Sequence, residues 1–92
     1  MIQGFRSAET RALFETGKSR RFGAIITVAT RKLTHLDAAA TLEFLKSPPG
    51  NRLEALKGER RGQYSIRVND QYRVCFRWKD GDAYDVELVD YH

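Results

Sequence analysis

Apolar residues in the first half of the chain follow helical spacing. A one-faced amphipathic helix is predicted by the positions of Phe22, Ile25, Ile26, Ala29, Leu33 and Leu36. A shorter helix is predicted before it, from Ala8 to Thr16, because Ser7 is a good N-cap and Gly17 suits a left-handed helix end. Residues 1–5 are apolar enough to be expected as a first strand.

The end of the helical region is marked by two prolines. Asp37 is expected to cap a continuation of the long helix from residue 38 to residue 46. The sequence SPPGN at residues 47–51 must end that continuation, because proline lacks an amide donor and restricts the residue before it.

After residue 51 the period of the apolar pattern changes to two. Alternating residues predict strands over residues 63–68, 72–78 and 84–88, and Leu53 and Leu56 flank a shorter one. Alternation of this kind is typical of antiparallel strands with one buried and one open face. The expected fold class is therefore α+β, with N-terminal helices packed on one face of a mainly antiparallel sheet, in a single domain over residues 1–92.

The register of this sheet follows from the rule that directly opposed residues share a face. A three-residue loop at 69–71 places Ile66 opposite Val74 and Arg67 opposite Arg73. The same rule places Trp78 opposite Tyr84, Arg77 opposite Asp85 and Cys75 opposite Glu87. The open face is then expected to carry Ser65, Arg67, Arg73, Cys75, Arg77, Asp85 and Glu87.

The charge balance points to a polyanionic partner. The 92 residues include 16 Lys and Arg against 12 Asp and Glu, and the basic residues gather within residues 16–36 and 52–79. A solvated surface with ordinary charge scatter is the alternative. The candidate RNA-binding residues are Lys18, Arg20, Arg21, Arg31, Lys32, Arg52, Arg60, Arg61, Arg67 and Arg77.

Candidate chemistry is confined to a few positions. Arg67 opposite Arg73 repels across the ladder unless an anion lies between them or both side chains splay into water. His92 is a candidate acid or base, although a terminal residue often frays. The single cysteine, Cys75, is expected to be a small packed residue. No recognisable metal-ligand spacing or phosphate-binding glycine loop occurs, and no cofactor is expected.

Three stretches, LEALKG, GQYSIRVNDQYRVCF and VELVDYH, together resemble the C-terminal half of HigB-type toxins of the RelE/ParE superfamily. The opening MIQGFRSAETRALFETGKSRRF is similar to the same group, so the resemblance covers essentially the whole chain. The expected α+β arrangement agrees with the RelE-like, microbial-RNase-like fold of that family.

The resemblance implies a toxin of a type II toxin–antitoxin system that cleaves translated messenger RNA in the ribosomal A site. Cleavage would use the 2′-hydroxyl as nucleophile, without metal or cofactor. The implied partners are a helix-turn-helix antitoxin of the HigA type, the ribosome and messenger, and operator DNA only through the antitoxin complex. A cytoplasmic location without a membrane is expected. The family's active-site positions fall on Lys57, Arg73, Asp90, Tyr91 and His92.

One departure leaves the general base open. Some members of the family carry a histidine where this chain has Glu54, so proton transfer depends on His92, Asp90 or Glu54. Two other functions remain as alternatives: a ParE-like poison of DNA gyrase, and a non-catalytic module that binds RNA or the antitoxin. The ending Asp90-Tyr91-His92 and the arginine-bearing face favour the nuclease.

Overall fold

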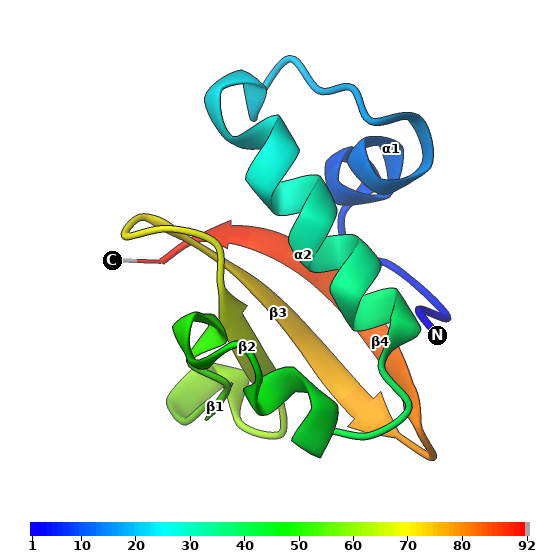
Figure 1. Ribbon diagram of the computed structural model, residues 1–92, viewed down its shortest axis with the longest axis vertical. Helices are drawn as coiled ribbons and strands as arrows, with labels where there is room; N and C mark the ends of the chain where they lie inside the picture. Colours follow the sequence, from blue (N-terminus) through cyan, green and yellow to red (C-terminus); the bar gives the residue numbers. More distant parts are fainter. Residues whose placement is uncertain (92) are drawn as a thin grey trace.

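Two helices lie on one face of a four-stranded antiparallel sheet in the computed structural model, which describes residues 1–91 (Figure 1). The helices are α1 (Ala8–Thr16) and α2 (Ile26–Ala38). The strands, in their order across the sheet, are β1 (Glu54–Ala55), β2 (Tyr64–Arg67), β3 (Tyr72–Lys79) and β4 (Asp82–Asp90). Short 3-10 helices cover Gly23–Ile25, Glu43–Lys46, Pro49–Asn51 and Gly58–Arg60. The expected fold class is confirmed. Within residues 1–91, no helix has the length and apolar character needed to span a bilayer.

The first helix has the ends that its sequence predicts. The Ser7 hydroxyl accepts a hydrogen bond from the amide of Thr10, and Gly17 ends the helix at φ 69°. The Thr10 hydroxyl is fully buried and accepts a hydrogen bond of 3.0 Å from the Leu88 amide. This bond fixes α1 against β4, which carries the candidate residues at its end.

The second helix stops earlier than predicted. Ala39 turns to an extended backbone, and its amide donates to the carbonyl of Leu36. The Asp37 side chain does not cap a continuation, because it accepts a hydrogen bond of 2.8 Å from the amide of Ile2. Only the 3-10 helix Glu43–Lys46 remains of the predicted extension. The prediction of a helix over residues 38–46 is therefore wrong.

The predicted register is confirmed on one side of β3 and wrong in part on the other. Ile66 lies opposite Val74 and Arg67 opposite Arg73. In the β3–β4 hairpin, Cys75 lies opposite Glu87, but Trp78 faces Ala83 and Arg77 faces Tyr84. The turn uses only Asp80 and Gly81, both with positive φ, and a bulge at Asp85 restores the register toward Glu87.

Residues 1–5 form no strand, contrary to the prediction. Two isolated parallel bridges connect this segment to β4, between Ile2 and Ala83 and between Phe5 and Val86. The amino group of Met1 lies 3.3 Å from the Asp82 carboxylate. The segment is thus attached along β4 without becoming a regular strand.

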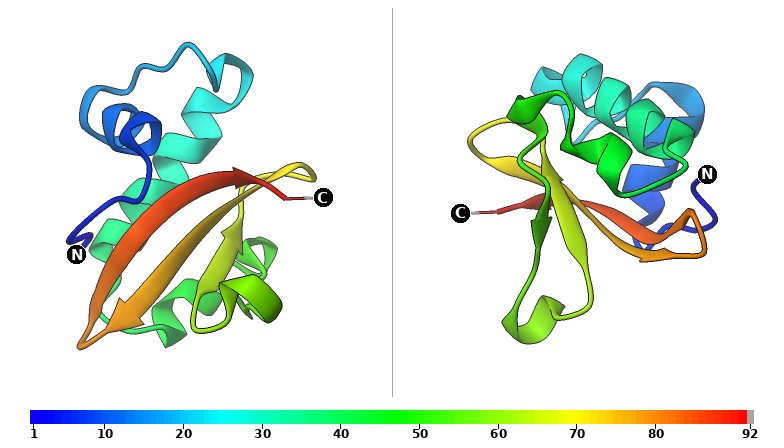
Figure 2. Two further views of the ribbon diagram at one scale, coloured as in Figure 1. Left: turned by 180° about the vertical axis from the view of Figure 1, so that it is seen from behind. Right: turned by 60° about the horizontal axis from the view of Figure 1, so that its bottom comes forward.

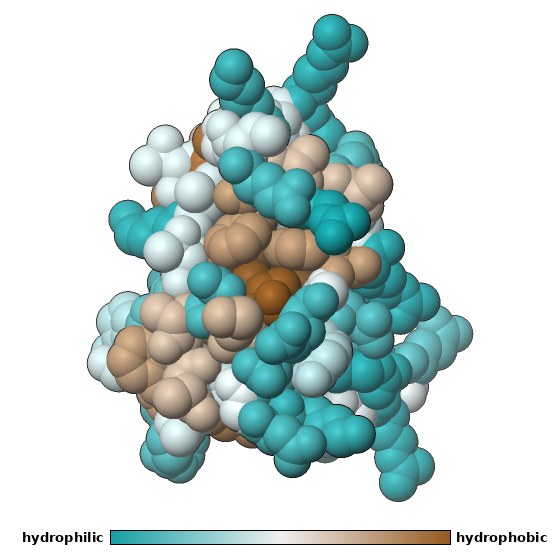
Figure 3. Space-filling model, turned by 90° about the vertical axis from the view of Figure 1, so that its right-hand side faces the viewer, coloured by the Kyte–Doolittle hydropathy of each residue, from teal (hydrophilic) through white to brown (hydrophobic). Residues whose placement is uncertain are grey.

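The core lies between the helices and the sheet. Its buried residues include Leu13, Phe22, Ala29, Leu33, Leu36, Ile66, Val74, Phe76, Val86 and Leu88. The left panel of Figure 2 shows the other face of the sheet, in front of the helices. On the side shown in Figure 3, hydrophilic side chains project around a central apolar area.

The face of the sheet away from the helices is less open than predicted. Ser65 and Cys75 are fully buried, and Arg73 is only 9% exposed. The chain before β2 accounts for this burial at Arg73, because the guanidinium reaches across Ser65 to Arg52 and Glu54. An arginine predicted to project into water is therefore held within the structure.

Candidate active site

Arg73 is the centre of the candidate site. Its Nε donates a hydrogen bond of 2.7 Å to the Ser65 hydroxyl, and its Nη2 donates one of 2.6 Å to the carbonyl oxygen of Arg52. Its Nη1 lies 3.1 Å from the Glu54 carboxylate. Three directions of the guanidinium are thus fixed by Ser65 of β2, Glu54 of β1 and Arg52, which lies two residues before β1. A cation held in this way needs little reorganisation to meet developing negative charge.

Tyr91 and Glu54 both contact this cation. The Cζ of Arg73 is 5.8 Å from the centre of the Tyr91 ring, within the range of a cation–π contact. The Tyr91 amide donates a hydrogen bond of 2.7 Å to the carbonyl of Gln71, which holds the backbone after β4 in place. The Glu54 side chain is 53% exposed, so one carboxylate beside Arg73 remains accessible to a substrate.

A cavity of about 390 Å³ adjoins these residues and is lined by Arg60, Val89, Asp90 and Tyr91. The Asp90 carboxylate accepts a hydrogen bond of 3.0 Å from the side chain of Gln71. Arg60 lies 3.5 Å from Glu87 and donates to Gln63, which fixes its guanidinium at the wall of the cavity. The cavity therefore adjoins one fixed cation, Arg60, and the aromatic residue Tyr91, and Asp90 forms part of its lining.

The two remaining predicted catalytic residues have different positions. Lys57 is exposed and stands immediately before the 3-10 helix Gly58–Arg60, and no hydrogen bond or ion pair joins it to the other described candidates. His92 lies outside the described residues. Of the five predicted catalytic residues, the structure brings Arg73 and Tyr91 into contact. Asp90 lies opposite Tyr72, whereas Arg73 lies opposite Val89, so the side chains of Asp90 and Arg73 leave the sheet on opposite faces.

The proposed repulsion between Arg67 and Arg73 is relieved without an added anion. Arg67 forms an ion pair with Asp70 of the adjacent turn, and Arg73 forms one with Glu54. The two arginines are directly opposed as predicted, but each has its own carboxylate. The structure therefore relieves the repulsion in a way that neither alternative included, through a protein carboxylate beside each arginine.

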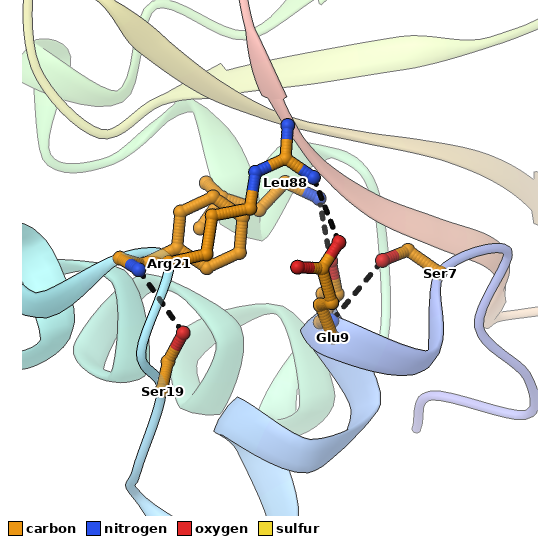
Figure 4. Close-up of polar contacts among 7 residues, drawn as sticks. Ser7, Glu9, Ser19, Arg21 and Leu88 are labelled. Carbon is orange, nitrogen blue, oxygen red and sulfur yellow. Dashed lines mark hydrogen bonds and ion pairs between the residues drawn. The ribbon is translucent and has the colours of Figure 1, made fainter.

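The other predicted RNA-binding residues are spread over both layers. Lys18, Arg20 and Arg21 lie between α1 and the 3-10 helix Gly23–Ile25, and all three are exposed. Figure 4 shows the ion pair of 2.7 Å between Arg21 and Glu9. The hydrogen bond with Glu9, and then its charge, raise the pKa of Arg21.

A second group of cations lies on α2 and near β2. Lys32 is partly buried, and its amine donates to the side chain of Asn51. Burial lowers the pKa of the Lys32 amine, and the nearby charges of Arg31 and Arg67 lower it further. Arg31, Arg52, Arg61 and Arg77 are exposed. This surface can meet a polyanion, and Lys32 is a partly buried member of it.

Cys75 is not available as a nucleophile. It is fully buried in β3, and burial raises the pKa of its thiol, so the thiolate is disfavoured at neutral pH. We expect Ellman's reagent at pH 7.5 to modify the folded protein far more slowly than the urea-unfolded protein. Equal rates in the two states would show that the thiol is exposed.

The described residues include no group of three or more His, Cys, Asp or Glu side chains that could hold a metal ion.

The sequence analysis gave too little weight to two residues beside Arg73. Ser65 orients Arg73, and Glu54 forms its ion pair. Glu54 lies opposite Ser65 in the β1–β2 pair, so the register of that short pair is the signal that places both residues beside Arg73.

Comparison with known proteins gives a consistent set of relatives. A family model described as "RelE-like toxin of type II toxin-antitoxin system HigB" matches residues 3–92. The chain is 42% identical over 90 residues to a protein named Toxin HigB-1 from Vibrio cholerae, covering 96% of this chain and 95% of that toxin. It is 32% identical to Endoribonuclease HigB from Proteus vulgaris over 93 residues, with full coverage of both chains.

Among solved structures, the fold is similar to a chain of the YoeB–YefM toxin–antitoxin complex from Staphylococcus aureus. The TM-score is 0.63 at 17% identity, and the match covers 100% of this chain and 98% of that chain. At 17% identity this structural similarity shows the fold alone, whereas the family model and the two sequence relatives show the family.

Proposed function

Because the chain belongs to the HigB family of RelE-like toxins of type II toxin–antitoxin systems, we propose that it is an endoribonuclease that cleaves translated messenger RNA in the ribosomal A site. The observation that carries this proposal is the Arg73 guanidinium, fixed by Ser65 and Glu54 and in contact with the Tyr91 ring. A relative that is 32% identical over its full length is named an endoribonuclease.

The proposed reaction is attack of a 2′-hydroxyl on the adjacent phosphate. A base takes the hydroxyl proton, an acid protonates the departing 5′-oxygen, and cations stabilise the extra charge of the pentavalent phosphorane. Arg73 and Lys57 are the proposed cations, because guanidinium and ammonium groups bind phosphate oxygens. Tyr91 would stack on a base or donate its hydroxyl to the phosphate.

The general base is proposed from three carboxylate and imidazole candidates, Glu54, Asp90 and His92. Glu54 is supported by its contact with Arg73, which places a carboxylate beside the proposed phosphate site. Asp90 is supported by its position on the cavity that Tyr91 also lines. A phosphate that pairs with Arg73 would release the Glu54 carboxylate toward the reacting hydroxyl.

Docking on the ribosome is proposed for exposed and partly buried cations outside the reacting group. The residues that would contact phosphates of ribosomal RNA are Lys18, Arg20, Arg31 and Lys32 of the helical layer and Arg52, Arg61 and Arg67 of the sheet layer. We further propose a helix-turn-helix antitoxin of the HigA type as the inhibitor. Operator DNA would be bound only by the toxin–antitoxin complex, and the site of action would be the cytoplasm.

Cleavage is expected to depend on translation. The protein is induced in cells that carry two versions of one reporter transcript, one with an intact start codon and one without it. Primer extension should map cuts only on the version with the start codon, which is translated. The new downstream ends should carry a 5′-hydroxyl, because attack by the 2′-hydroxyl keeps the phosphate attached to the upstream fragment. The ends should therefore ligate to an adaptor only after treatment with polynucleotide kinase.

Four outcomes would contradict the proposal. Equal cutting of both transcripts would remove the requirement for the ribosome. DNA damage with intact messenger would favour a gyrase poison, and growth arrest with neither lesion would favour a non-catalytic binding module. Ends that ligate without kinase would contradict attack by the 2′-hydroxyl.

A further inference from the structure

A second cavity, of about 540 Å³, lies at the other end of β3 from Arg73. It is lined by Gly62, Arg77, Trp78, Lys79, Tyr84 and Asp85. Arg77 follows Arg73 by four residues of the same strand, so the two backbone positions are separated by about 13 Å. The cavity is therefore distinct from the candidate active site and lies farther along the same strand.

Two backbone features shape this cavity. The bulge between β3 and β4 gives Asp85 a φ of 51°, an uncommon value for a residue other than glycine, and its carboxylate lies 3.5 Å from Arg77 Nε. Gly62 has a φ of 92°, and a Cβ there would lie 2.9 Å from Arg77 Nη1. A side chain at position 62 would therefore displace the end of the Arg77 side chain from its place in the cavity.

The lining combines aromatic rings with cations. Tyr84 and Trp78 are half-buried, and Tyr84 lies directly opposite the exposed Arg77. The Trp78 ring packs edge-on against the buried Phe76, with centroids 6.3 Å apart, so it is held in place beside the core. Aromatic rings beside Arg and Lys are the features that bind unpaired nucleotides, by stacking and by phosphate contact.

We propose that this cavity binds one unpaired nucleotide of the RNA substrate, away from the cleaved phosphate. The base stacks on Tyr84, while Arg77 and Lys79 contact the phosphate. The Asp85 carboxylate accepts a hydrogen bond from an N–H of the base, which favours a nucleotide over an inorganic anion. This inference rests on the proposed function for its ligand, because it assumes that RNA is the substrate.

Trp78 provides a direct measurement of binding, because it is the only tryptophan of the chain and lines the cavity. The probe is a single-stranded hexanucleotide of 2′-O-methyl RNA, which has no free 2′-hydroxyl and cannot be cleaved. We expect a saturable change in tryptophan fluorescence. Tyr84→Ala should weaken binding about tenfold, whereas Tyr84→Phe should retain most of the affinity because the stacking ring remains.

Arg77 gives a second variant that should leave the fold unchanged, because its side chain is exposed. Arg77→Ala should also weaken binding about tenfold. Arg11→Ala is the matched control, since it removes one exposed arginine of an ion pair on α1 and changes the net charge equally. Arg11→Ala should bind the oligonucleotide as the wild type does. Equal weakening by both substitutions would mean that only net charge matters, and would overturn the proposed site.

Cleavage measured separately distinguishes this inference from the proposed function. If the wild type cuts translated messenger but Tyr84→Ala binds and cuts equally well, the nucleotide site is wrong and the nuclease proposal remains. If the wild type cuts no messenger, the proposed function fails regardless of oligonucleotide binding. If Trp78 fluorescence responds to an antitoxin peptide and not to RNA, the cavity belongs to a protein interface and the inference is also wrong.

Discussion

Replacement of Arg73 by alanine is expected to reduce messenger cleavage by about 10²–10³-fold, the effect of removing one group that stabilises transition-state charge. Growth arrest on induction should disappear with it. Arg73→Lys should restore little activity, because a lysine cannot bond to Ser65, Arg52 and Glu54 in the directions that a guanidinium does. Ser65→Ala should give an intermediate loss, since it removes one of the contacts that orient the arginine.

Stability must be measured with activity in these variants. Removing the Arg73 side chain leaves the buried hydroxyl of Ser65 without its donor, at a cost of about 1–3 kcal/mol. Urea denaturation gives that cost, and assays are compared at temperatures where each variant is folded. Arg11→Ala is the control for loss of one positive charge. A folded Arg73→Ala variant that still arrests growth would exclude Arg73 from the site.

Deletion of Tyr91 and His92 is expected to abolish cleavage and to leave ribosome binding intact. The deletion removes the aromatic ring beside Arg73 and the imidazole of His92. The last buried apolar side chain of β4 is Leu88, so the deletion leaves the core intact. The cations proposed to meet ribosomal RNA all lie before residue 80. The shortened protein should therefore co-sediment with ribosomes without producing cut messenger.

Two smaller changes divide the effect of that deletion. Removal of His92 alone tests the imidazole, and Tyr91→Phe tests the phenolic hydroxyl while keeping the ring over Arg73. If the chain without Tyr91 and His92 keeps full activity, the general base must be Glu54 or Asp90. Loss of co-sedimentation would show that the tail is part of the docking surface and contradict the separation of binding from chemistry.

The register between β2 and β3 could be predicted because both strands alternate without interruption. Only one loop length puts Ile66 against Val74, and that pairing is observed. The register of the β3–β4 hairpin could be predicted only in part. Alternation of apolar and polar residues gives the register only when each residue of one strand faces a single residue of the other. A two-residue turn at Asp80 and Gly81 shifts the register, and the bulge at Asp85 shifts it back.

The candidate site shows a similar limit. Arg73 was found from its opposition to Arg67 and from the family resemblance, and its place on the face away from the helices is confirmed by its neighbours. Its burial was not predicted, since it depends on where the two-residue strand β1 lies. The helix extension failed for a comparable reason: Asp37 bonds to Ile2, a partner remote in sequence.

The attachment of residues 1–5 along β4 also affects how the protein behaves at high concentration. A sheet normally offers the unpaired amides of its outermost strands to other chains, and this is a common route to aggregation. Here the bridges at Ile2 and Phe5 occupy part of the outer side of β4, and the opposite edge is a strand of only two residues. Neither border presents a long template for strand addition. We therefore expect an affinity tag before Met1, which would disturb the ion pair with Asp82, to lower solubility more than surface substitutions do.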